Sequence, residues 1–430
     1  MRDQSFNYES LSRQIRKSDF FAHPTLKDPL QYKLNLTNAI TASATLFNGI
    51  DPLASFHYKK RTLYKPNNFH NELVARKLRA HISSVKGLTP PNRDFIVSNL
   101  SLLLREGTPM RIYRLDIKRF YESIDADYLE QQLSGIKQLS PISKDLTLSI
   151  LESYRSKGGT GVPRGLAISA SLSDLVLQNF DKKVRESKDV FFVARYVDDI
   201  IIVTNCLEDP ALFLAFVQSA LPKGLKLNQS KTSISELPDR VKPQSRQELE
   251  CGPPTPQSII TPELCAFDFL GYRFSISDTN KTKDLPIFRS VKIGLSTQKF
   301  KRYKTRISRS FLQFRRDGNF ENLENRLIFL TSNFSIHDYN TSKKKLAGIF
   351  FSYPRIVVET DSTLRMLDAF LKKAILSSQG RIFSATSSML TRAQKNRLLK
   401  NSFYKGHAER TFRHFSKTQI ALIQGCWKYE

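Results

Sequence analysis

The chain has 430 residues, of which 40% are hydrophobic and 11% aromatic. This is enough apolar material for a large packed core, and it excludes an intrinsically disordered chain. Lys and Arg total 67 against 40 Asp and Glu, a formal net charge of +27, so a polyanion is the first partner to expect. Residues 281–430 alone hold 30 Lys or Arg and 10 Asp or Glu, which favours a nucleic-acid-binding module in that third of the chain.

Two further classes of protein are set aside. The four cysteines, Cys206, Cys251, Cys265 and Cys426, are spaced too widely for a CxxC pair, so neither a zinc site nor a disulfide framework is predicted. No apolar run approaches the roughly 18 residues that span a bilayer, and the N-terminus lacks the apolar stretch of a signal peptide. We therefore expect a cytoplasmic protein with no membrane partner, and its oligomeric state is left open.

The composition changes along the chain. Residues 1–110 combine short helical patterns with a basic segment around Arg61, Lys65 and Arg76, and residues 111–275 hold most of the strand-like patterns. Residues 233–266 contain six of the 19 prolines, which argues against a regular element there and favours a surface insertion.

Two segments with carboxylates stand out in the strand-rich part. Asp116 follows an alternating apolar stretch, as at the end of a strand, and Asp198 and Asp199 separate two apolar runs within residues 190–203, as at a hairpin turn. Asp is a common turn residue, so a plain solvent-exposed turn is the alternative. Adjacent carboxylates repel each other unless a cation is present, and three of them on neighbouring strands could hold a pair of Mg²⁺ ions.

A third segment, residues 157–185, runs from a Gly- and Pro-rich loop into a helix with apolar residues at steps of four. A flexible loop that enters a helix N-terminus suits a phosphate-bearing or base-paired ligand, although an ordinary connecting loop is the commoner case. It matches neither a Walker A pattern nor GxGxxG.

Residues 297–318 predict a long amphipathic helix that ends at Gly318, with aromatic and aliphatic residues at steps of three and four. A solvated face is the ordinary explanation for its charges, but no acidic residue neutralises them, which favours contact with a nucleic-acid backbone. A second basic patch lies at residues 391–417, where packing is the favoured role of the aromatics. The basic residues of the long helix are Lys299, Lys301, Arg302, Lys304, Arg306, Arg309, Arg315 and Arg316.

The order of these segments resembles a family, the reverse transcriptases or RNA-directed DNA polymerases, over roughly residues 55–275. The matching motifs are DIKRFY at 116–121, GVPRG at 161–165, YVDD at 196–199, GLKLNQSKT at 224–232 and FDFLGYRF at 267–274. Overall architecture, a compact chain with a basic extension, is most similar to the bacterial defence-associated members.

The resemblance implies a catalytic role for four side chains. Asp116 and Asp198 would bridge two Mg²⁺ ions, with Mn²⁺ as an alternative, and Asp199 would support them; the backbone carbonyl of Ile117 would add a ligand. Lys231 matches the lysine that protonates the leaving pyrophosphate in this family.

The resemblance also implies the groups that contact substrates. Tyr121 matches an aromatic gate that excludes the ribose 2′-hydroxyl, so deoxynucleoside triphosphates would be preferred. The three basic residues before position 80 would contact either the triphosphate or template phosphates, and both alternatives stay open. The expected nucleotide-binding residues are Tyr121, Pro163, Arg164, Gly165, Arg61, Lys65 and Arg76, and the expected primer grip is Leu270, Gly271 and Tyr272.

The fold expected from the resemblance is an α+β right-hand polymerase with fingers, a palm built on an antiparallel sheet, a helical thumb and a basic helical C-terminal extension. We place the N-terminal region and fingers at 1–110, the palm at 111–275, the thumb at 276–375 and the extension at 376–430. Expected partners are an RNA template, the DNA product and dNTPs, with a dedicated non-coding RNA and a partner protein in antiviral defence.

One departure from the family motif leaves alternatives open. Arg164 stands where the family usually has Gln, which adds a cation beneath the nucleotide. A template-independent or protein-primed DNA polymerase is therefore the second hypothesis. A non-catalytic nucleic-acid-binding scaffold is the third, and the presence of Asp116, Asp198 and Asp199 argues against it.

Overall fold

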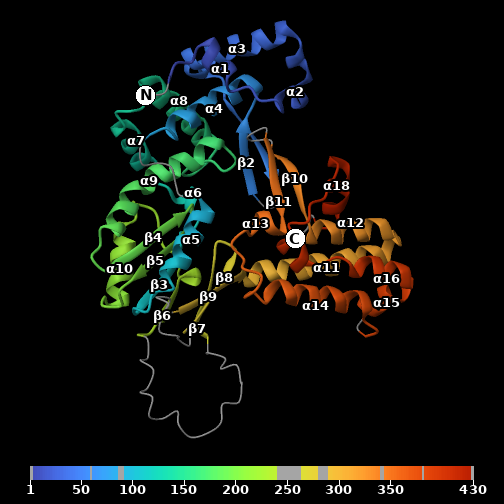
Figure 1. The fold of residues 1–430 in the computed structure, drawn as a ribbon. Helices are drawn as coiled ribbons and strands as arrows, with labels where there is room; N and C mark the ends of the chain where they lie inside the picture. Colours follow the sequence, from blue (N-terminus) through green and yellow to red (C-terminus); the bar gives the residue numbers. More distant parts are fainter. Residues whose placement is uncertain are drawn as a thin grey trace. The chain divides into compact units, whose positions relative to one another are not determined.

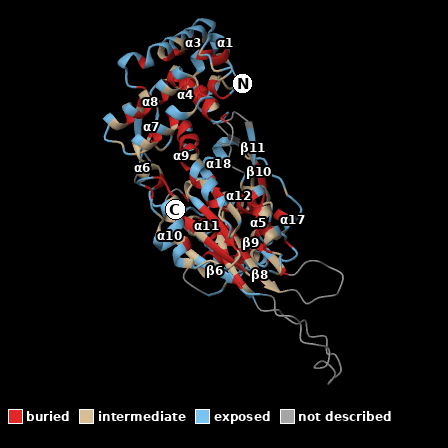
Figure 2. Cartoon of the chain, turned by 90° about the vertical axis from the view of Figure 1, so that its left-hand side faces the viewer, coloured by how far each residue is buried: buried red, intermediate tan, exposed pale blue. Residues whose placement is uncertain are grey.

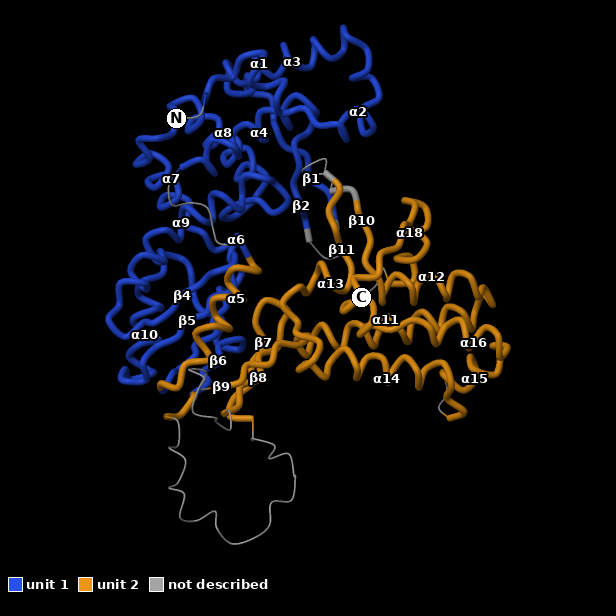
Figure 3. Tube along the Cα trace, viewed as in Figure 1, with its two compact units in different colours: residues 1–92, 109–236 blue, residues 93–108, 237–430 orange. Residues whose placement is uncertain are grey.

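The structure is a computed structural model, which describes residues 3–58, 61–85, 92–239, 263–278, 289–338, 343–379 and 382–427. It contains two compact units, drawn in separate colours in Figure 3. Unit 1 comprises residues 1–92 and 109–236, and unit 2 comprises residues 93–108 and 237–430. Each unit is thus built from two chain segments, and the expected division into fingers, palm, thumb and extension stays a prediction.

Unit 1 begins with a helical layer and a hairpin (Figure 1). Local capping explains where its longest N-terminal helix begins, because the Asp28 side chain accepts a hydrogen bond from the Leu30 N–H at 3.0 Å and Pro29 occupies the first turn. Strands β1 and β2 pair antiparallel. The elements are α1 (Tyr8–Ser12), α2 (Asp19–Ala22), η1 (Pro24–Lys27), α3 (Pro29–Ala44), η2 (Leu46–Gly49), β1 (Leu53–Tyr58), β2 (Arg61–Pro66), α4 (Phe69–Ile82), α6 (Phe120–Ser123), α7 (Ala126–Gly135) and α8 (Pro141–Ser156).

The second part of unit 1 is a four-stranded sheet in the order β4-β5-β3-β6. β3 and β5 are almost entirely buried, and α9 presents ten buried residues to the same core, which Figure 2 shows in red. This burial explains the continuous apolar run at residues 200–203, because a central strand that is covered on both faces needs no alternation. The elements are β3 (Met110–Asp116), α9 (Ala167–Arg185), β4 (Val190–Tyr196), β5 (Asp199–Thr204), α10 (Pro210–Ala220), η3 (Gln229–Lys231) and β6 (Ser233–Leu237).

Unit 2 combines a three-stranded antiparallel sheet, in the order β7-β8-β9, with a helical bundle and a second hairpin. The predicted amphipathic helix is α11, and Gly318 caps it in the left-handed conformation at φ 63°. The elements are α5 (Arg93–Leu103), β7 (Glu263–Phe269), β8 (Tyr272–Asp278), β9 (Arg289–Leu295), α11 (Thr297–Asp317), α12 (Phe320–Thr331), β10 (Asn333–Asp338), β11 (Lys343–Gly348), α13 (Ile349–Ser352), α14 (Thr363–Leu376), α15 (Phe383–Met389), α16 (Arg392–Leu399), α17 (Phe403–Ala408) and α18 (Lys417–Gly425).

Two expectations about regular structure need correction. The proline-rich segment 233–266 was expected to contain no regular element, but its ends belong to β6 and β7, because its prolines begin only at Pro238. Residues 276–375 are not purely helical, since β9 and the hairpin β10–β11 lie among the helices. The α+β class is confirmed, and no helix in the described ranges is long and apolar enough to cross a membrane.

Candidate active site

Three carboxylates meet at one end of the unit 1 sheet. Asp116 is the last residue of β3, Asp199 is the first residue of β5, and the two are register partners in the antiparallel pair. Side chains directly opposite each other on such a pair lie on the same face of the sheet. Asp198 precedes β5 in the turn, and its carbonyl accepts a hydrogen bond from the Ile117 N–H at 3.2 Å. The predicted strand end and hairpin turn are therefore confirmed.

Two side chains of the 224–232 motif engage Asp116. The Lys231 ammonium donates to Asp116 Oδ1 at 2.8 Å, and the Asn228 side-chain amide donates to Asp116 Oδ2 at 3.0 Å. The Asn228 N–H also donates to the Asp116 carbonyl at 2.7 Å. These three bonds join the motif to the end of β3. Asn228 and Lys231 therefore belong to one cluster with Asp116, although they follow it by 112 and 115 positions in the chain.

The electrostatics of this cluster show an excess of negative charge. Loss of solvation around the carboxyl group, followed by the like charges of Asp198 and Asp116, raises the pKa of Asp199, although the residue as a whole is exposed. The hydrogen bond to Asp116 is the main cause of the raised pKa of Lys231, and the charges of Asp116, Asp198 and Asp199 add to it. A cation is therefore favoured at this position, and Lys231 supplies one.

The residues fit a divalent cation in their chemistry. Carboxylate oxygens are the ligands that Mg²⁺ prefers, and three carboxylates share one unneutralised region. They do not form a finished cluster, because within the described parts of the chain no three acidic, His or Cys side chains converge as a metal site. Both oxygens of Asp116 are engaged by Lys231 and Asn228, so a metal ion would exchange with the ammonium group.

A buried arginine, Arg195, stabilises the turn that carries Asp198. Arg195 donates from Nη1 to the Val197 carbonyl at 3.1 Å, and Val197 has a left-handed φ of 62°. Its guanidinium also binds Asp181 through Nη2 at 2.7 Å and Asp174 at 3.1 Å. Burial alone would lower the pKa of Arg195, but its bonds and charge interaction with Asp181 and then Asp174 outweigh this effect and raise it. A β-branched residue in this conformation needs such support.

The Gly- and Pro-rich loop lies against Tyr121. The Val162 N–H donates to the Tyr121 carbonyl at 2.8 Å, and the Arg164 guanidinium lies 5.0 Å from the centre of the Tyr121 ring. Pro163 precedes Arg164, and its carbonyl accepts a hydrogen bond from the Ser169 hydroxyl at 2.5 Å. The cation that Arg164 adds is paired within the protein, because its guanidinium donates to the Glu122 carboxylate.

The three basic residues predicted near the nucleotide differ in their surroundings. Arg76 is buried, and its guanidinium binds Asp19 at 2.7 Å and Glu72, so the expectation that it contacts a triphosphate is wrong. Its position on the core face of α4 explains this outcome. Lys65 is exposed on β2 and lies 6.0 Å from the Phe56 ring. The side chain of Arg61 lies outside the described residues.

The expected primer grip is the tight turn between β7 and β8 in unit 2. Leu270 and Gly271 both have left-handed φ values, 47° and 80°. Arg93, the first residue of α5, donates from Nε to the Leu270 carbonyl at 2.9 Å and stacks on the Tyr272 ring at 4.8 Å. Arg93 also donates to the Ser352 carbonyl at 3.0 Å, so it ties the turn to the end of α13.

The basic residues of α11 divide into two groups. Lys301 and Arg302 are exposed, whereas Lys304 lies 4.7 Å from the Phe370 ring and Arg306 lies 5.2 Å from the Trp427 ring. Burial, and then the charges of Arg302, Arg93 and Arg306, lowers the pKa of Lys299. Contact of these residues with a nucleic-acid backbone stays a prediction, and some of the cations stabilise unit 2 by contact with aromatic rings.

Two aromatic residues of the C-terminal patch pack against other rings, which agrees with the favoured role, whereas Phe412 is exposed. Phe403 is fully buried and contacts Tyr303 edge-on at 5.4 Å between ring centres. Phe415 packs on Phe329 and Phe334.

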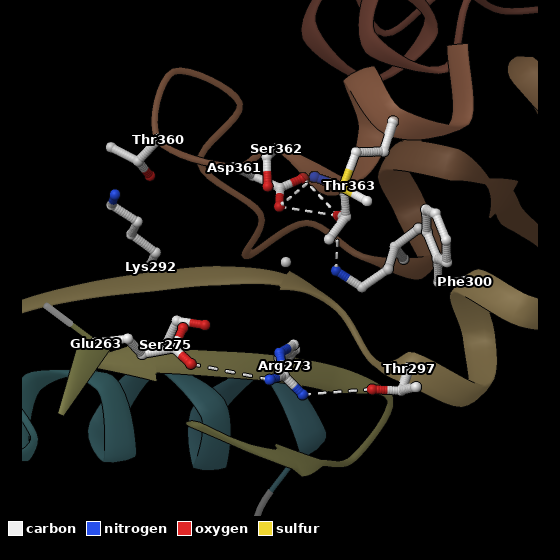
Figure 4. Close-up of a pocket in the computed structure, with 13 residues that line it drawn as sticks. Glu263, Arg273, Ser275, Lys292, Thr297, Phe300, Thr360, Asp361, Ser362 and Thr363 are labelled. Atoms are coloured by element: carbon white, nitrogen blue, oxygen red, sulfur yellow. Dashed lines mark hydrogen bonds and ion pairs between the residues drawn. The ribbon is translucent and has the colours of Figure 1, made fainter. Parts of the chain in front are cut away.

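Unit 2 contains a cavity of about 420 Å³ (Figure 4). It lies over β8 and β9 beside the first turns of α11 and α14. In the close-up, Arg273 lies between Glu263 and Thr297 and interacts with both. Asp361 caps α14, because it accepts a hydrogen bond from the Thr363 N–H at 3.0 Å. Arg273 and Asp361 are therefore engaged within the protein.

Four residues near these sites were missed by sequence reasoning. Asn228 lies in a motif that was identified only for Lys231, so its position could have been noticed. Glu122 directly follows Tyr121, the expected gate, but its pairing with Arg164 across 42 positions carries no local signal. The contacts of Arg195 and Arg93 also carry no local signal in the sequence.

Comparisons with known proteins agree with the motifs. The family model described as reverse transcriptase (RNA-dependent DNA polymerase) matches residues 68–274. No curated protein sequence matches the chain.

Similar solved structures include three telomerase chains. Apo telomerase from Candida tropicalis has 13% identity and a TM-score of 0.37, with 87% of this chain and 64% of that chain covered. Its form truncated from the C-terminal domain has 14% identity and a TM-score of 0.34, with 56% and 54% covered. Telomerase from Candida albicans in complex with a TWJ fragment of telomeric RNA has 15% identity and a TM-score of 0.33, with 82% and 54% covered. The chain spans between about half and two thirds of these solved chains.

The family match extends from α4 to β8 and contains all five motifs. Together with the helices and antiparallel sheets, it confirms the expected right-hand polymerase fold. Residues 68–274 of this chain therefore form a reverse transcriptase (RNA-dependent DNA polymerase) domain.

Proposed function

We propose that the protein is an RNA-directed DNA polymerase that adds deoxynucleotides to a 3′-hydroxyl group. The observation that carries this proposal is the cluster of Asp116, Asp198 and Asp199 with Lys231, inside a domain of the reverse transcriptase family. Phosphoryl transfer of this kind depends on positioning and on neutralisation of charge, and the cluster offers groups for both.

The three carboxylates would hold two Mg²⁺ ions, with Mn²⁺ as a substitute, and the carbonyl of Ile117 would add a ligand. Such ions, when bound, activate the attacking hydroxyl group and neutralise the triphosphate. Asn228 orients Asp116 through its amide at 3.0 Å. Lys231 carries a proton on Nζ, and its raised pKa keeps that proton in place at neutral pH until a leaving group can take it.

Further residues would contact the substrates. Tyr121 would exclude the ribose 2′-hydroxyl, and Pro163 and Gly165 would shape the loop beneath the base. Lys65 remains a ligand for phosphate, because it is exposed. Leu270, Gly271 and Tyr272 would hold the primer end, and exposed Lys301 and Arg302 would contact duplex phosphates.

Substitution of Asp198 tests the proposal. Purified full-length Asp198→Asn should incorporate no dNTP on a primed RNA template with Mg²⁺, but it should still bind the primer–template duplex. Asp145→Asn, an exposed position on α8, is the matched control and should retain full incorporation. Persistent incorporation by Asp198→Asn would overturn the metal-site assignment.

The alternative of template-independent or protein-primed synthesis is motivated by Arg164, which stands where the family usually has Gln. Its ion pair with Glu122 weakens that motive, because the net charge beneath the nucleotide is cancelled. Product sequencing with RNA, with DNA and without any template distinguishes the two activities. The scaffold alternative predicts no incorporation under any of these conditions.

A role in antiviral defence with a dedicated RNA and a partner protein, and a cytoplasmic location, rest on the resemblance alone. Protection of a bacterial host by the wild-type chain, and its loss in Asp198→Asn, would support the defence role. Sequencing of RNA that co-purifies with the protein would identify the template.

A further inference from the structure

The loop at residues 159–166 is fastened to the backbone of Tyr121. Gly161 has a φ of 68°, and a Cβ atom built on it would lie 2.1 Å from the Tyr121 carbonyl oxygen. The adjacent Val162 N–H donates to the same carbonyl at 2.8 Å. Any side chain at position 161 would separate the loop from Tyr121, so glycine is required there.

The same loop is fastened to β2 on its other side. The Tyr64 N–H donates to the Arg164 carbonyl at 2.9 Å. Gly165 has a φ of 103°, and a Cβ atom on it would lie 2.5 Å from the Tyr64 carbonyl oxygen. The backbone of Arg164 is therefore held between β2 and the segment that carries Tyr121.

The Arg164 side chain makes two interactions from this fixed backbone. Both Nε and Nη2 donate to the Glu122 carboxylate, the latter at 3.0 Å, in a two-point geometry that fixes the guanidinium plane. The guanidinium also lies over the Tyr121 ring, with 5.0 Å from its carbon to the ring centre. The bond to Glu122 is the main cause of the raised pKa of Arg164.

The remaining sides of the Tyr121 ring are also enclosed. Phe120 packs on it with ring centres 5.4 Å apart, and the buried Ser173 side chain lies near the phenol hydroxyl group. Burial raises the pKa of Tyr121, and the nearby charge of Asp198 adds to this effect. The Tyr121 ring is thus half-buried near Asp198, and the Arg164 guanidinium covers one of its faces.

We propose that Arg164, held by Glu122, is a positioning residue that fixes the Tyr121 ring and thereby sets the discrimination between deoxynucleotides and ribonucleotides. This inference rests on the proposed polymerase function and on Tyr121 as the group that meets the sugar. Arg164 acts through Tyr121 because its own charge is paired with Glu122 at two bonds. A Tyr121 ring that can rotate makes room for a 2′-hydroxyl group. Discrimination against ribonucleotides should therefore decrease when Arg164 or Glu122 is replaced.

Single-nucleotide incorporation on a primed RNA template tests this role. We measure kcat/KM for a dNTP and for the matching rNTP with full-length wild type, Arg164→Gln, Glu122→Gln and Tyr121→Ala. Arg164→Gln should lower the dNTP-to-rNTP ratio about tenfold, mostly through a lower KM for the rNTP. Glu122→Gln should change the ratio in the same direction but less, because the stacked guanidinium remains.

A double variant separates positioning from direct contact. If Arg164 acts through the ring, Arg164→Gln should lower the ratio no further in a Tyr121→Ala background. Arg155→Gln is the matched control, because Arg155 forms a comparable pair with a different carboxylate, Glu130, at 2.6 Å in the same unit. This control should leave the ratio unchanged.

Three outcomes would overturn the inference. The first is a dNTP-to-rNTP ratio that is unchanged in Arg164→Gln and Glu122→Gln but falls in Tyr121→Ala. This result would leave the polymerase function intact and reject the positioning role of Arg164. An equal fall for dNTP and rNTP would make Arg164 a direct ligand or a purely structural residue. Absence of any incorporation by the wild type would reject the proposed function itself.

Discussion

Asp116 and Asp199 stand directly opposite each other in the antiparallel pair of β3 and β5. Two carboxylates in this relationship repel each other, and Asp198 in the adjoining turn adds a third negative charge. Lys231 offsets part of this charge by its bond to Asp116. The site therefore carries an excess of negative charge in the folded chain, and its effect on stability can be measured.

Neutralising Asp199 should stabilise the protein in a buffer without divalent cations. The pKa of this carboxyl group is raised in the folded chain, so its ionisation costs stability as the pH rises above about 4, and the full cost is present at neutral pH. Asp199→Asn removes that cost. We expect a gain below about 1 kcal/mol in the free energy of unfolding, because solvent screens the exposed group.

Urea denaturation at pH 7 with EDTA measures this gain, and excess Mg²⁺ should stabilise the wild type more than Asp199→Asn. A loss of stability in the variant in EDTA, or an equal gain from Mg²⁺ in both proteins, would contradict the electrostatic interpretation of the site.

Removal of the Lys231 ammonium should slow nucleotide addition. Lys231→Met keeps the length of the side chain but loses the proton donor, and we expect a fall in kcat of about 10²-fold or more. Lys231→Arg keeps a charge at Asp116 and should retain more activity. Pre-steady-state incorporation across pH 6 to 9 checks this: the raised pKa keeps Lys231 protonated over the whole range, so the deficit of Lys231→Met relative to the wild type should persist up to pH 9.

Arg195 should be a strong contributor to the stability of unit 1. Its side chain is 6% exposed and pairs with Asp174 and Asp181, so Arg195→Met leaves two carboxylates without their partner. We expect a loss of about 3–5 kcal/mol in the free energy of unfolding. Arg13→Met, which removes an exposed pair with Glu9, should cost less than about 1 kcal/mol. Equal effects in the two variants would contradict the burial argument.

His81 should make stability depend on pH. Burial lowers its pKa from 6.5 to about 4, with a smaller contribution from Lys77, while Nδ1 bonds the Ser143 hydroxyl at 2.8 Å. The neutral form is favoured in the folded chain, so this contribution is complete above pH 6.5 and is lost as the pH falls from 6.5 towards 4. The loss between pH 7.5 and pH 5 should be about 2 kcal/mol.

The comparison is between wild type and His81→Asn, in which Asn can still bond Ser143. Denaturant titrations at both pH values should show a smaller pH effect in the variant by about this amount. Parallel pH curves for the two proteins would exclude His81 as the cause.

The two groups of cations on α11 should behave differently. Substitution of exposed Lys301 and Arg302 should weaken duplex binding and reduce the slope of log K against log salt by about 0.9 for each phosphate that is no longer neutralised. Substitution of Lys304 or Arg306 should lower stability, because these cations pack on Phe370 and Trp427. Fluorescence anisotropy at several salt concentrations, with a thermal melt of each variant, distinguishes the groups. A salt slope unchanged in Lys301→Ala/Arg302→Ala would exclude this part of α11 as a phosphate-binding surface.

Much of the local structure was predictable because its signals are short in range. The strand end at Asp116, the turn before Asp199 and the boundaries of α11 follow from apolar periodicity and from residues such as Gly318 that suit a helix end. The proline-rich segment was predicted less well, since its composition hid the strand residues at both edges.

The chain's own residue order determined the class of fold, the family motifs and the carboxylates, because hydrophobic period and motif spacing are properties of neighbouring residues. Only the tertiary structure decided which charges are available. Arg76 is buried against Asp19, Arg164 is paired with Glu122 and Lys231 with Asp116, over separations of 57, 42 and 115 positions. A basic residue looks the same in the sequence whether it faces solvent or a carboxylate. Its partner is chosen by packing and by the cost of burying an unpaired charge.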